Sequence, residues 1–280
     1  MQVQALKSRI IKPGDDLLAV IDEVISIRLN GQLPDNSVLA ISSKIVSYCQ
    51  GRLVKKEKTQ QKGFSSEEIK AEKHALVQKE AELFTKPYSS KYDMMLTIKA
   101  STLAVNAGID ESNASLNGEE CFVLWPEKLQ ETINEVWQHL RQKYKLQNFG
   151  VIITDSRSFP LRWGVIGTAI AYCGFKALNN YIGQTDLFAR KIQMVQVNVA
   201  EALGVAATFE MGEVKEATPV VLLTDLAKVQ FVNHVPSQKE LEDSKIALED
   251  DVYSPLLTNV DWHKGAAYSE IASQGEIIHE

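Results

Sequence analysis

The sequence has few of the features that mark a secreted, membrane-spanning or disulfide-rich protein. Its three cysteines, Cys49, Cys121 and Cys173, are widely spaced, which suggests neither a disulfide framework nor a zinc knuckle. No apolar run approaches the roughly 20 residues that a membrane-spanning helix needs. The first residues also lack the apolar core of a signal peptide. We therefore expect a cytoplasmic protein without a membrane partner.

The usual sequence signatures of several enzyme classes are missing as well. Neither G-x-x-x-x-G-K-[ST] nor G-x-G-x-x-G occurs, so the P-loop and dinucleotide-binding folds lose their main support. The five histidines show no ligand spacing, which argues against a zinc enzyme, and no G-x-S-x-G elbow is present. The net charge of −6 disfavours nucleic acid as a partner, because binding its phosphates requires a concentrated basic face.

The 280 residues that are present suffice for one large domain or two smaller ones. Apolar residues at helical spacing predict helices over 17–28, 129–144 and about 200–210, with Asp15 or Asp16 capping the first. Ser65 and Glu68 form a possible capping box for a helix through Phe84. Short apolar or alternating runs predict strands at 38–41, 121–124, 151–154, 192–199 and 220–223. The pattern indicates a mixture of α and β structure.

Two further features have simple structural interpretations. The segment 52–74 contains six lysines, and such a run is typical of a solvated, mobile surface. Trp125 and Trp163 are expected to pack in the interior rather than to serve as stacking platforms.

Three carboxylates in loops provide the oxygen ligands that Mg²⁺ or Mn²⁺ prefers. Asp155 directly follows the predicted strand 151–154, and Ser156 supplies an adjacent hydroxyl. Asp110 lies in the polar stretch VNAGIDESNAS at 105–115. Glu213 follows a predicted helix that ends at a glycine. A metal site is therefore one interpretation of these acids.

Each acid also has an ordinary structural explanation, and the residues alone leave both open. Asp110 can form an Asx-turn beside a glycine with a positive φ. Asp155 can cap a turn or pair with Arg157 or Arg162. Glu213 can be a solvated glutamate after a helix C-cap.

Five blocks of sequence, taken in order, resemble the coenzyme F(420)-0:L-glutamate ligases, which add γ-linked glutamates to a deazaflavin coenzyme using GTP. The blocks are residues 11–17, 43–47 with 51–52, 106–113, 155–164 with 185–188, and 211–221, and the N-A-G-[IV]-D-x-S-N block at 106–113 is the most specific. The resemblance implies an α+β fold with mixed sheets and flanking helices, two lobes and an intertwined homodimer. We expect a ligase-like domain over 1–236 and an acidic C-terminal extension over 237–280, partly packed on the body.

The resemblance also implies site residues and co-substrates. Two sites for Mg²⁺ or Mn²⁺ are implied, with Asp110 and Asp155 as ligands of one and Ser156 and Glu213 as ligands of the other. Lys44 and Arg162 are the implied catalytic residues. The implied nucleotide contacts are Ser8, Arg9, Ile10, Ile11, Ser43, Lys44, Asn113, Met211, Gly212, Glu213, Val214, Lys215, Glu216, Ala217 and Thr218. The small-molecule partners are GTP, L-glutamate and a carboxylate acceptor.

The sequence departs from the family on the side expected to face the acceptor. The family motif D-[ST]-F-G-R-P-W-R-x-G reads D-S-R-S-F-P-L-R-W-G here, so Phe159 replaces a basic residue and Leu161 a tryptophan. Three hypotheses follow: a GTP-dependent ligase acting on the deazaflavin coenzyme, the same chemistry on another carboxylate acceptor, or a non-catalytic nucleotide-binding relative.

Overall fold

The computed structural model describes residues 1–87 and 91–268, which form two compact units. The first unit comprises Met1–Gly51 and Pro126–Ser244. The second comprises Arg52–Trp125 and the chain from Lys245 onward. Each unit has its own sheets and its own buried apolar cluster.

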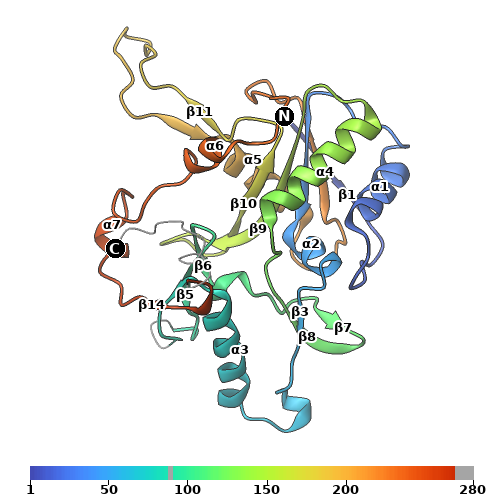
Figure 1. The fold of residues 1–280 in the computed structure, drawn as a ribbon, viewed down its shortest axis with the longest axis vertical. Helices are drawn as coiled ribbons and strands as arrows, with labels where there is room; N and C mark the ends of the chain where they lie inside the picture. Colours follow the sequence, from blue (N-terminus) through green and yellow to red (C-terminus); the bar gives the residue numbers. More distant parts are fainter. Residues whose placement is uncertain (88–90, 269–280) are drawn as a thin grey trace. The chain divides into compact units, whose positions relative to one another are not determined.

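The first unit is built on a five-stranded sheet with helices on both faces (Figure 1). The strand order is β1 (Gln2–Leu6), β13 (Val220–Thr224), β2 (Ser37–Ser42), β9 (Phe149–Ser158) and β10 (Val165–Cys173). Only β2 and β9 are parallel within this sheet. One face carries α5 (Val199–Met211), and the other carries α1 (Leu17–Arg28) and α4 (Leu129–Tyr144). The remaining elements are α2 (Ser43–Cys49), α6 (Gln238–Glu242) and the ribbon of β11 (Leu178–Asn180) and β12 (Gln196–Asn198).

Alternation along the central strands explains this layering. Val38 and Ala40 on β2 and Ile152 on β9 are fully buried in one cluster with the α5 residues Leu203 and Ala207. The residues between them point to the opposite face because successive side chains of a strand alternate. Helix α5 therefore rests on the sheet through small and branched apolar side chains.

The second unit contains α3 (Ser66–Glu80) and two small sheets. One sheet has the order β3 (Leu53–Lys55), β8 (Glu119–Val123) and β7 (Ser115–Leu116). The other has the order β14 (His263–Lys264), β4 (Leu83–Phe84), β5 (Leu96–Lys99) and β6 (Thr102–Val105). Short 3₁₀ helices lie at Gln60–Lys62 and Asn106–Gly108, and α7 spans Ser254–Leu257.

The prediction of mixed α and β structure is confirmed, and helices form at Leu17–Arg28 and Leu129–Tyr144, where the apolar spacing predicted them. Asp16 caps the first by accepting a hydrogen bond from Ala19 N. The predicted helix through Phe84 is too long, because it ends at Glu80 and the Glu82 N–H then donates to Ile98 O. The strand predicted over 192–199 forms only at its end, as β12.

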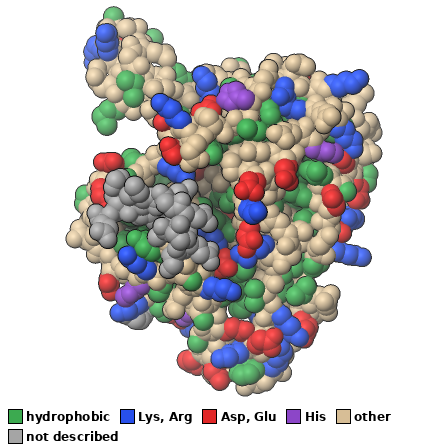
Figure 2. All heavy atoms as spheres, viewed as in Figure 1, with side chains coloured by type: hydrophobic (Ala, Val, Ile, Leu, Met, Phe, Trp, Pro, Cys, Tyr) green, Lys and Arg blue, Asp and Glu red, His purple; other side chains and the backbone are tan. Residues whose placement is uncertain are grey.

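The two simple interpretations of polar and aromatic residues need correction. Within the lysine-rich segment, Lys56 is only 8% exposed. Trp125 is buried as predicted, but Trp163 is 91% exposed. Acidic and basic side chains are interspersed on the face shown in Figure 2. None of the helices within residues 1–87 and 91–268 has the length and apolarity that a membrane crossing requires.

Candidate functional site

Asp155 and Ser156 lie where the parallel pairing of β9 stops. The register of β2 with β9 ends at the pair Ser42 and Thr154. The strand does not end there as predicted, because β9 continues to Ser158 with β10 as its partner. Both residues therefore extend beyond the carboxyl end of the parallel pair, which is the edge of a sheet where ligands commonly bind.

The residue after Asp155 contacts an acid from a distant part of the chain. Ser156 Oγ donates a hydrogen bond of 2.8 Å to Glu213 Oε1, across 57 positions of sequence. Helix α5 ends at Met211, and Gly212, with φ 73°, turns the chain toward β9. Asp155 Oδ1 also accepts from Ser156 N at 2.8 Å. Two residues predicted to share one metal are thus in contact.

The oxygen donors just beyond the parallel pairing of β2 with β9 suit a hard cation such as Mg²⁺ or Mn²⁺. They are carboxylate and hydroxyl oxygens, and Ser156 and Glu213 already converge on one point. Within the described residues, no group of three or more His, Cys, Asp or Glu side chains is placed to hold a metal ion by itself. A cation here would therefore complete its shell with phosphate or water oxygens, as Mg²⁺ usually does.

Two glycines set the spacing between β10 and α5. Gly167 on β10 is the register partner of Ser156. A Cβ on Gly167 would lie 2.4 Å from Gly204 O, and one on Gly204 would lie 3.0 Å from Ala169 N. Helix α5, which leads to Glu213, therefore packs on the sheet almost backbone to backbone.

The segment from Met211 to Thr218 forms a closed loop. Thr218 Oγ1 donates to Met211 O at 2.7 Å, which ties the end of the loop to its start. Val214 N donates to Glu216 Oε2 at 2.8 Å. These hydrogen bonds give the loop a defined shape beside the Ser156–Glu213 contact.

One other predicted nucleotide-binding segment bonds to this loop, and the residue before a second segment, Ser43–Lys44, bonds to the residue that follows the loop. Ser8 N donates to Ala217 O at 2.9 Å, and Ser42 N donates to Pro219 O at 2.9 Å. Ser43 begins α2 immediately after β2 and is buried, and Lys44 follows it. The structure therefore brings together the segments at 8–11, 43–44 and 211–218, which lie far apart in the sequence.

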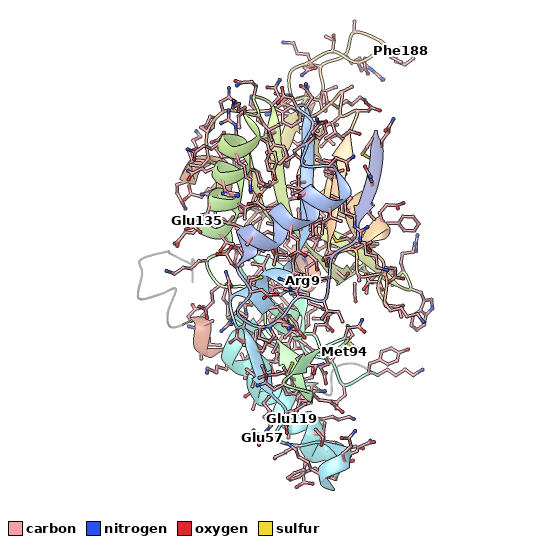
Figure 3. The ribbon with its side chains drawn as sticks, turned by 90° about the vertical axis from the view of Figure 1, so that its right-hand side faces the viewer. Arg9, Glu57, Met94, Glu119, Glu135 and Phe188 are labelled. Atoms are coloured by element: carbon pink, nitrogen blue, oxygen red, sulfur yellow. The ribbon has the colours of Figure 1, made fainter. Side chains whose placement is uncertain are left out.

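The N-terminal segment lines a cavity of about 240 Å³ against α1. Arg9, labelled in Figure 3, donates to Asp15 at 2.5 Å and to Glu23 at 3.1 Å. Ile10 is 84% exposed. The lining residues are Lys7, Ser8, Arg9, Ile11, Val20, Glu23, Val24, Ile27 and Arg28.

Arg162 lies in the turn between β9 and β10 and is exposed. Its Nη1 donates to Leu161 O at 2.8 Å, within its own turn. Arg157 lies 3.7 Å from Glu201 of α5, so that arginine is directed toward the helix.

In the second unit, Asp110 forms the Asx-turn that was one of its two interpretations. Its Oδ1 accepts from Glu111 N at 2.6 Å and from Ser112 N at 2.8 Å. The backbone of Asp110 exchanges two hydrogen bonds with Val123 on β8. Gly108, with φ 71°, packs so closely on Trp125 that a Cβ would lie 2.0 Å from Nε1. The turn fixes the carboxylate, and a fixed carboxylate can still ligate a cation.

A cluster that the sequence analysis missed holds this turn in place. The two carboxylate oxygens of Glu111 pair with Lys56 at 2.6 Å and Lys73 at 2.5 Å. Lys56 Nζ also lies 3.3 Å from Glu120 and 5.1 Å from the centre of the Phe122 ring. Burial opposes ionisation of Glu111, but the two lysines outweigh it and hold the pKa of that carboxyl below its ordinary value.

The model of the family described as F420-0:Gamma-glutamyl ligase matches residues 5–225. A coenzyme F420:L-glutamate ligase of Methanopyrus kandleri is 30% identical over 223 residues, covering 78% of this chain and 84% of the relative. The protein of the same name from Archaeoglobus fulgidus is 30% identical over 258 residues, covering 87% and 92%. One from Methanosarcina mazei is 30% identical over 229 residues, covering 79% and 84%. The chain therefore belongs to the F420-0:gamma-glutamyl ligase family.

Proposed function

We propose that this chain is a GTP- and divalent-metal-dependent ligase. It joins L-glutamate, in γ-linkage, to a carboxylate of an acceptor of the deazaflavin coenzyme type. The observation that carries the proposal is the hydrogen bond between Ser156 and Glu213, just beyond the parallel pairing of β2 with β9, in a chain of this family. The relatives named above are called L-glutamate ligases of coenzyme F420, which supports the choice of both substrates.

The proposed reaction has two steps. A carboxylate oxygen of the acceptor attacks the γ-phosphorus of GTP, the bond to the bridging oxygen breaks, and GDP leaves. The product is an acyl phosphate, which gives the acyl carbon a good leaving group. The amine of glutamate then attacks that carbon, phosphate leaves, and the amine loses a proton as the amide forms. Activation is required because a free carboxylate has no leaving group that an amine can displace.

In this proposal the acids of the site hold the cations and the nearby loops hold the nucleotide. Asp110 and Asp155 would bind one Mg²⁺ or Mn²⁺, and Ser156 and Glu213 the second. A bound divalent cation neutralises charge that develops on the transferring phosphoryl group and on GDP. The convergence of 8–11, 43–44 and 211–218 supports a nucleotide site beside Ser156.

Two basic residues complete the proposed site. Lys44, at the start of α2, would contribute a positive charge toward the phosphates in place of a P-loop lysine. Arg162 would orient a carboxylate or phosphate by its planar guanidinium after turning away from Leu161 O.

The identity of the carboxylate acceptor has an alternative that the structure favours at one turn. The turn that carries Phe159 and Leu161 is apolar and open, with Leu161 95% exposed and Trp163 91% exposed. An exposed apolar turn at a place where the family has basic and aromatic residues favours a second candidate: the same ligase chemistry with a different carboxylate acceptor.

We also propose a homodimer. The arm at 181–195 between β11 and β12 extends from the first unit, and Phe188 marks its tip in Figure 3. Leu187 is 98% exposed, Phe188 77% and Met194 86%. Apolar side chains gathered on one arm are typical of a protein–protein interface.

Calorimetric titration with GDP and ADP, with and without Mn²⁺, tests the proposal. We expect wild-type protein to bind GDP in a Mn²⁺-dependent manner and to bind ADP more weakly. Asp155→Ala should abolish the metal dependence, whereas Asp186→Ala, which removes a carboxylate in the arm, should leave it unchanged. Absence of binding to either nucleotide by the wild type would refute the ligase site. Metal-dependent GDP binding without transfer of glutamate to any acceptor would favour the non-catalytic hypothesis.

A further inference from the structure

The short segment Asn106–Gly108, just before the Asp110 turn, has a left-handed backbone throughout. The φ angles are 52° at Asn106, 53° at Ala107 and 71° at Gly108. Ile109 N donates to Asn106 O at 2.9 Å and closes the segment into a turn. Glycine adopts this conformation freely and asparagine tolerates it, but alanine is strained in it, and left-handed residues normally occur singly. A run of three persists only where the surrounding structure imposes it.

Strand β5 and the residue before it hold the start and the middle of this left-handed turn. Asn106 N donates to Met95 O at 2.8 Å, and Met95 N donates to Asn106 Oδ1 at 2.9 Å. Thr97 on β5 is fully buried, and its Oγ1 accepts from Ala107 N at 2.9 Å. The same hydroxyl donates to Ala104 O at 2.9 Å. The Thr97 hydroxyl therefore has a fixed direction, and it holds the residue of the turn that is most strained.

Trp125 packs against the last residue of the left-handed turn. A Cβ on Gly108 would lie 2.0 Å from the indole Nε1, so the edge of the ring rests on the glycine backbone. Trp125 is 4% exposed, and its carbonyl oxygen accepts from Arg52 Nε at 3.2 Å. Arg52 in turn pairs with Glu80 at 2.7 Å. The position of the indole is therefore fixed by its own contacts, and the turn cannot move into the space that the ring fills.

Asp110 is the second residue after this turn. The pairing with Val123 fixes the backbone of Asp110 itself, and the turn fixes the chain that leads to it. We infer that Thr97 and Trp125 are positioning residues for the Asp110 carboxylate, because they hold the left-handed turn that sets the direction in which this carboxylate leaves the chain. This inference rests on the proposed function, in which Asp110 binds a divalent cation. Loss of a contact that orients a metal ligand typically lowers metal affinity by about 10- to 100-fold.

Variants of two threonines separate a positioning role from a purely structural one. Thr97→Val removes the hydroxyl at nearly constant volume, and Thr97→Ser restores it. Thr85→Val is the matched control, because the Thr85 hydroxyl also accepts a backbone N–H in this sheet, from Leu96 at 2.9 Å. That hydrogen bond joins Thr85 to β5 rather than to the left-handed turn.

Two tryptophan variants test the same point independently. Trp125→Phe removes the indole edge that lies on Gly108. Trp137→Phe is its matched control, because Trp137 Nε1 would lie 2.1 Å from a Cβ on Gly174, which is the same kind of contact within the first unit. Urea denaturation of the metal-free proteins should show each control destabilised about as much as the variant that it matches.

Titration with Mn²⁺ in the presence of GDP, with free Mn²⁺ followed by its electron paramagnetic resonance signal, gives the affinity of each protein. Asp110→Ala identifies the binding event that depends on Asp110. We expect this event to be about tenfold weaker in Thr97→Val and in Trp125→Phe. It should differ from wild type by less than about twofold in Thr97→Ser and in both controls.

Unchanged Mn²⁺ affinity in Thr97→Val and Trp125→Phe would overturn the inference. An equal loss of affinity in the two controls would also overturn it, because general destabilisation would then explain the effect. If Thr97→Val does not fold, the comparison of Trp125→Phe with Trp137→Phe decides in the same way. A wild type that binds no Mn²⁺, or an Asp110→Ala protein that binds it as wild type does, would refute the proposed metal role of Asp110 and this inference with it. Binding that is lost in Asp110→Ala but kept in both positioning variants would refute this inference alone.

Discussion

Replacing Glu111 with glutamine removes the charge that joins the Asp110 turn to two other elements of the second unit. Glu111 pairs with Lys56, which follows β3, and with Lys73 on α3. In Glu111→Gln, Lys56 keeps only the weaker contact to Glu120 at 3.3 Å among the carboxylates of this cluster. Since Lys56 is 8% exposed, its charge then lies in a poorly solvated place.

The size of the effect follows from this exposure. Removing one partner of a buried ion pair destabilises a protein by about 3–5 kcal/mol. The Glu111 side chain is 32% exposed and Glu120 remains, so solvent and the second carboxylate offset part of that loss. We therefore expect Glu111→Gln to lower the free energy of unfolding by about 1.5–3 kcal/mol at pH 7.

The effect must also depend on pH in a defined direction. The folded pKa of Glu111 is held below the value of about 4.3 that an unfolded glutamate has. The stabilisation is therefore present above pH 4.3 and is lost as the pH falls through the folded pKa. The difference between wild type and Glu111→Gln should be largest near pH 7 and should shrink toward pH 3.

Urea denaturation at pH 7 and pH 3, followed by circular dichroism, measures both quantities. Glu119→Gln is the matched control, because Glu119 pairs with Lys55 on the surface of the same unit. We expect no measurable change in its denaturation midpoint. A Glu111→Gln protein as stable as wild type at pH 7, or one whose deficit persists unchanged at pH 3, would refute the electrostatic argument.

Two further predictions concern packing and thiol chemistry. Gly174→Ala should lower the free energy of unfolding by more than about 3 kcal/mol. The added Cβ would lie 2.1 Å from Trp137 Nε1 and 2.2 Å from Phe149 O, and these two atoms form a hydrogen bond with each other. Gly183→Ala has a similar positive φ but open space, so a loss above about 2 kcal/mol there would contradict the reasoning. Burial raises the pKa of the Cys49 thiol to about 11, so folded protein should resist iodoacetamide at pH 8. Rapid alkylation of Cys49 in the folded protein, detected by mass spectrometry, would contradict the expectation that burial protects this thiol.

Signals within one element could be predicted from the sequence, because capping and helical period act over a few residues. The Ser65–Glu68 capping box forms as predicted, with both of its hydrogen bonds. The end of that helix was predicted wrongly because Leu83 and Phe84 pair with β5. The extent of β9 was missed for the same reason, since its partner β10 lies beyond a turn. Strand pairing depends on distant residues, and the local pattern does not contain them.

In the candidate site, too, local features could be predicted from the sequence and contacts between distant residues could not. The residue types were visible, but the meeting of Ser156 with Glu213 depends on how α5 packs on the sheet. Their grouping was expected from the family resemblance rather than from spacing. The pairing of Lys56 with Glu111 was missed because a run of lysines ordinarily indicates solvent, and here Phe122 shields one of them.

The glycine contact between β10 and α5 has a consequence for how this site tolerates sequence change. Ser156 lies on β9, beside Gly167 of β10, and Glu213 lies just beyond the end of α5, so their contact depends on the separation of β10 and α5 that backbone atoms at Gly167 and Gly204 set. Substitutions in the exposed turns can accumulate without altering that separation. A single methyl group at either glycine would push the helix outward and carry Glu213 away from Ser156. The alignment of the two oxygens is therefore set by the scaffold, which leaves the surrounding exposed turns free to change in sequence.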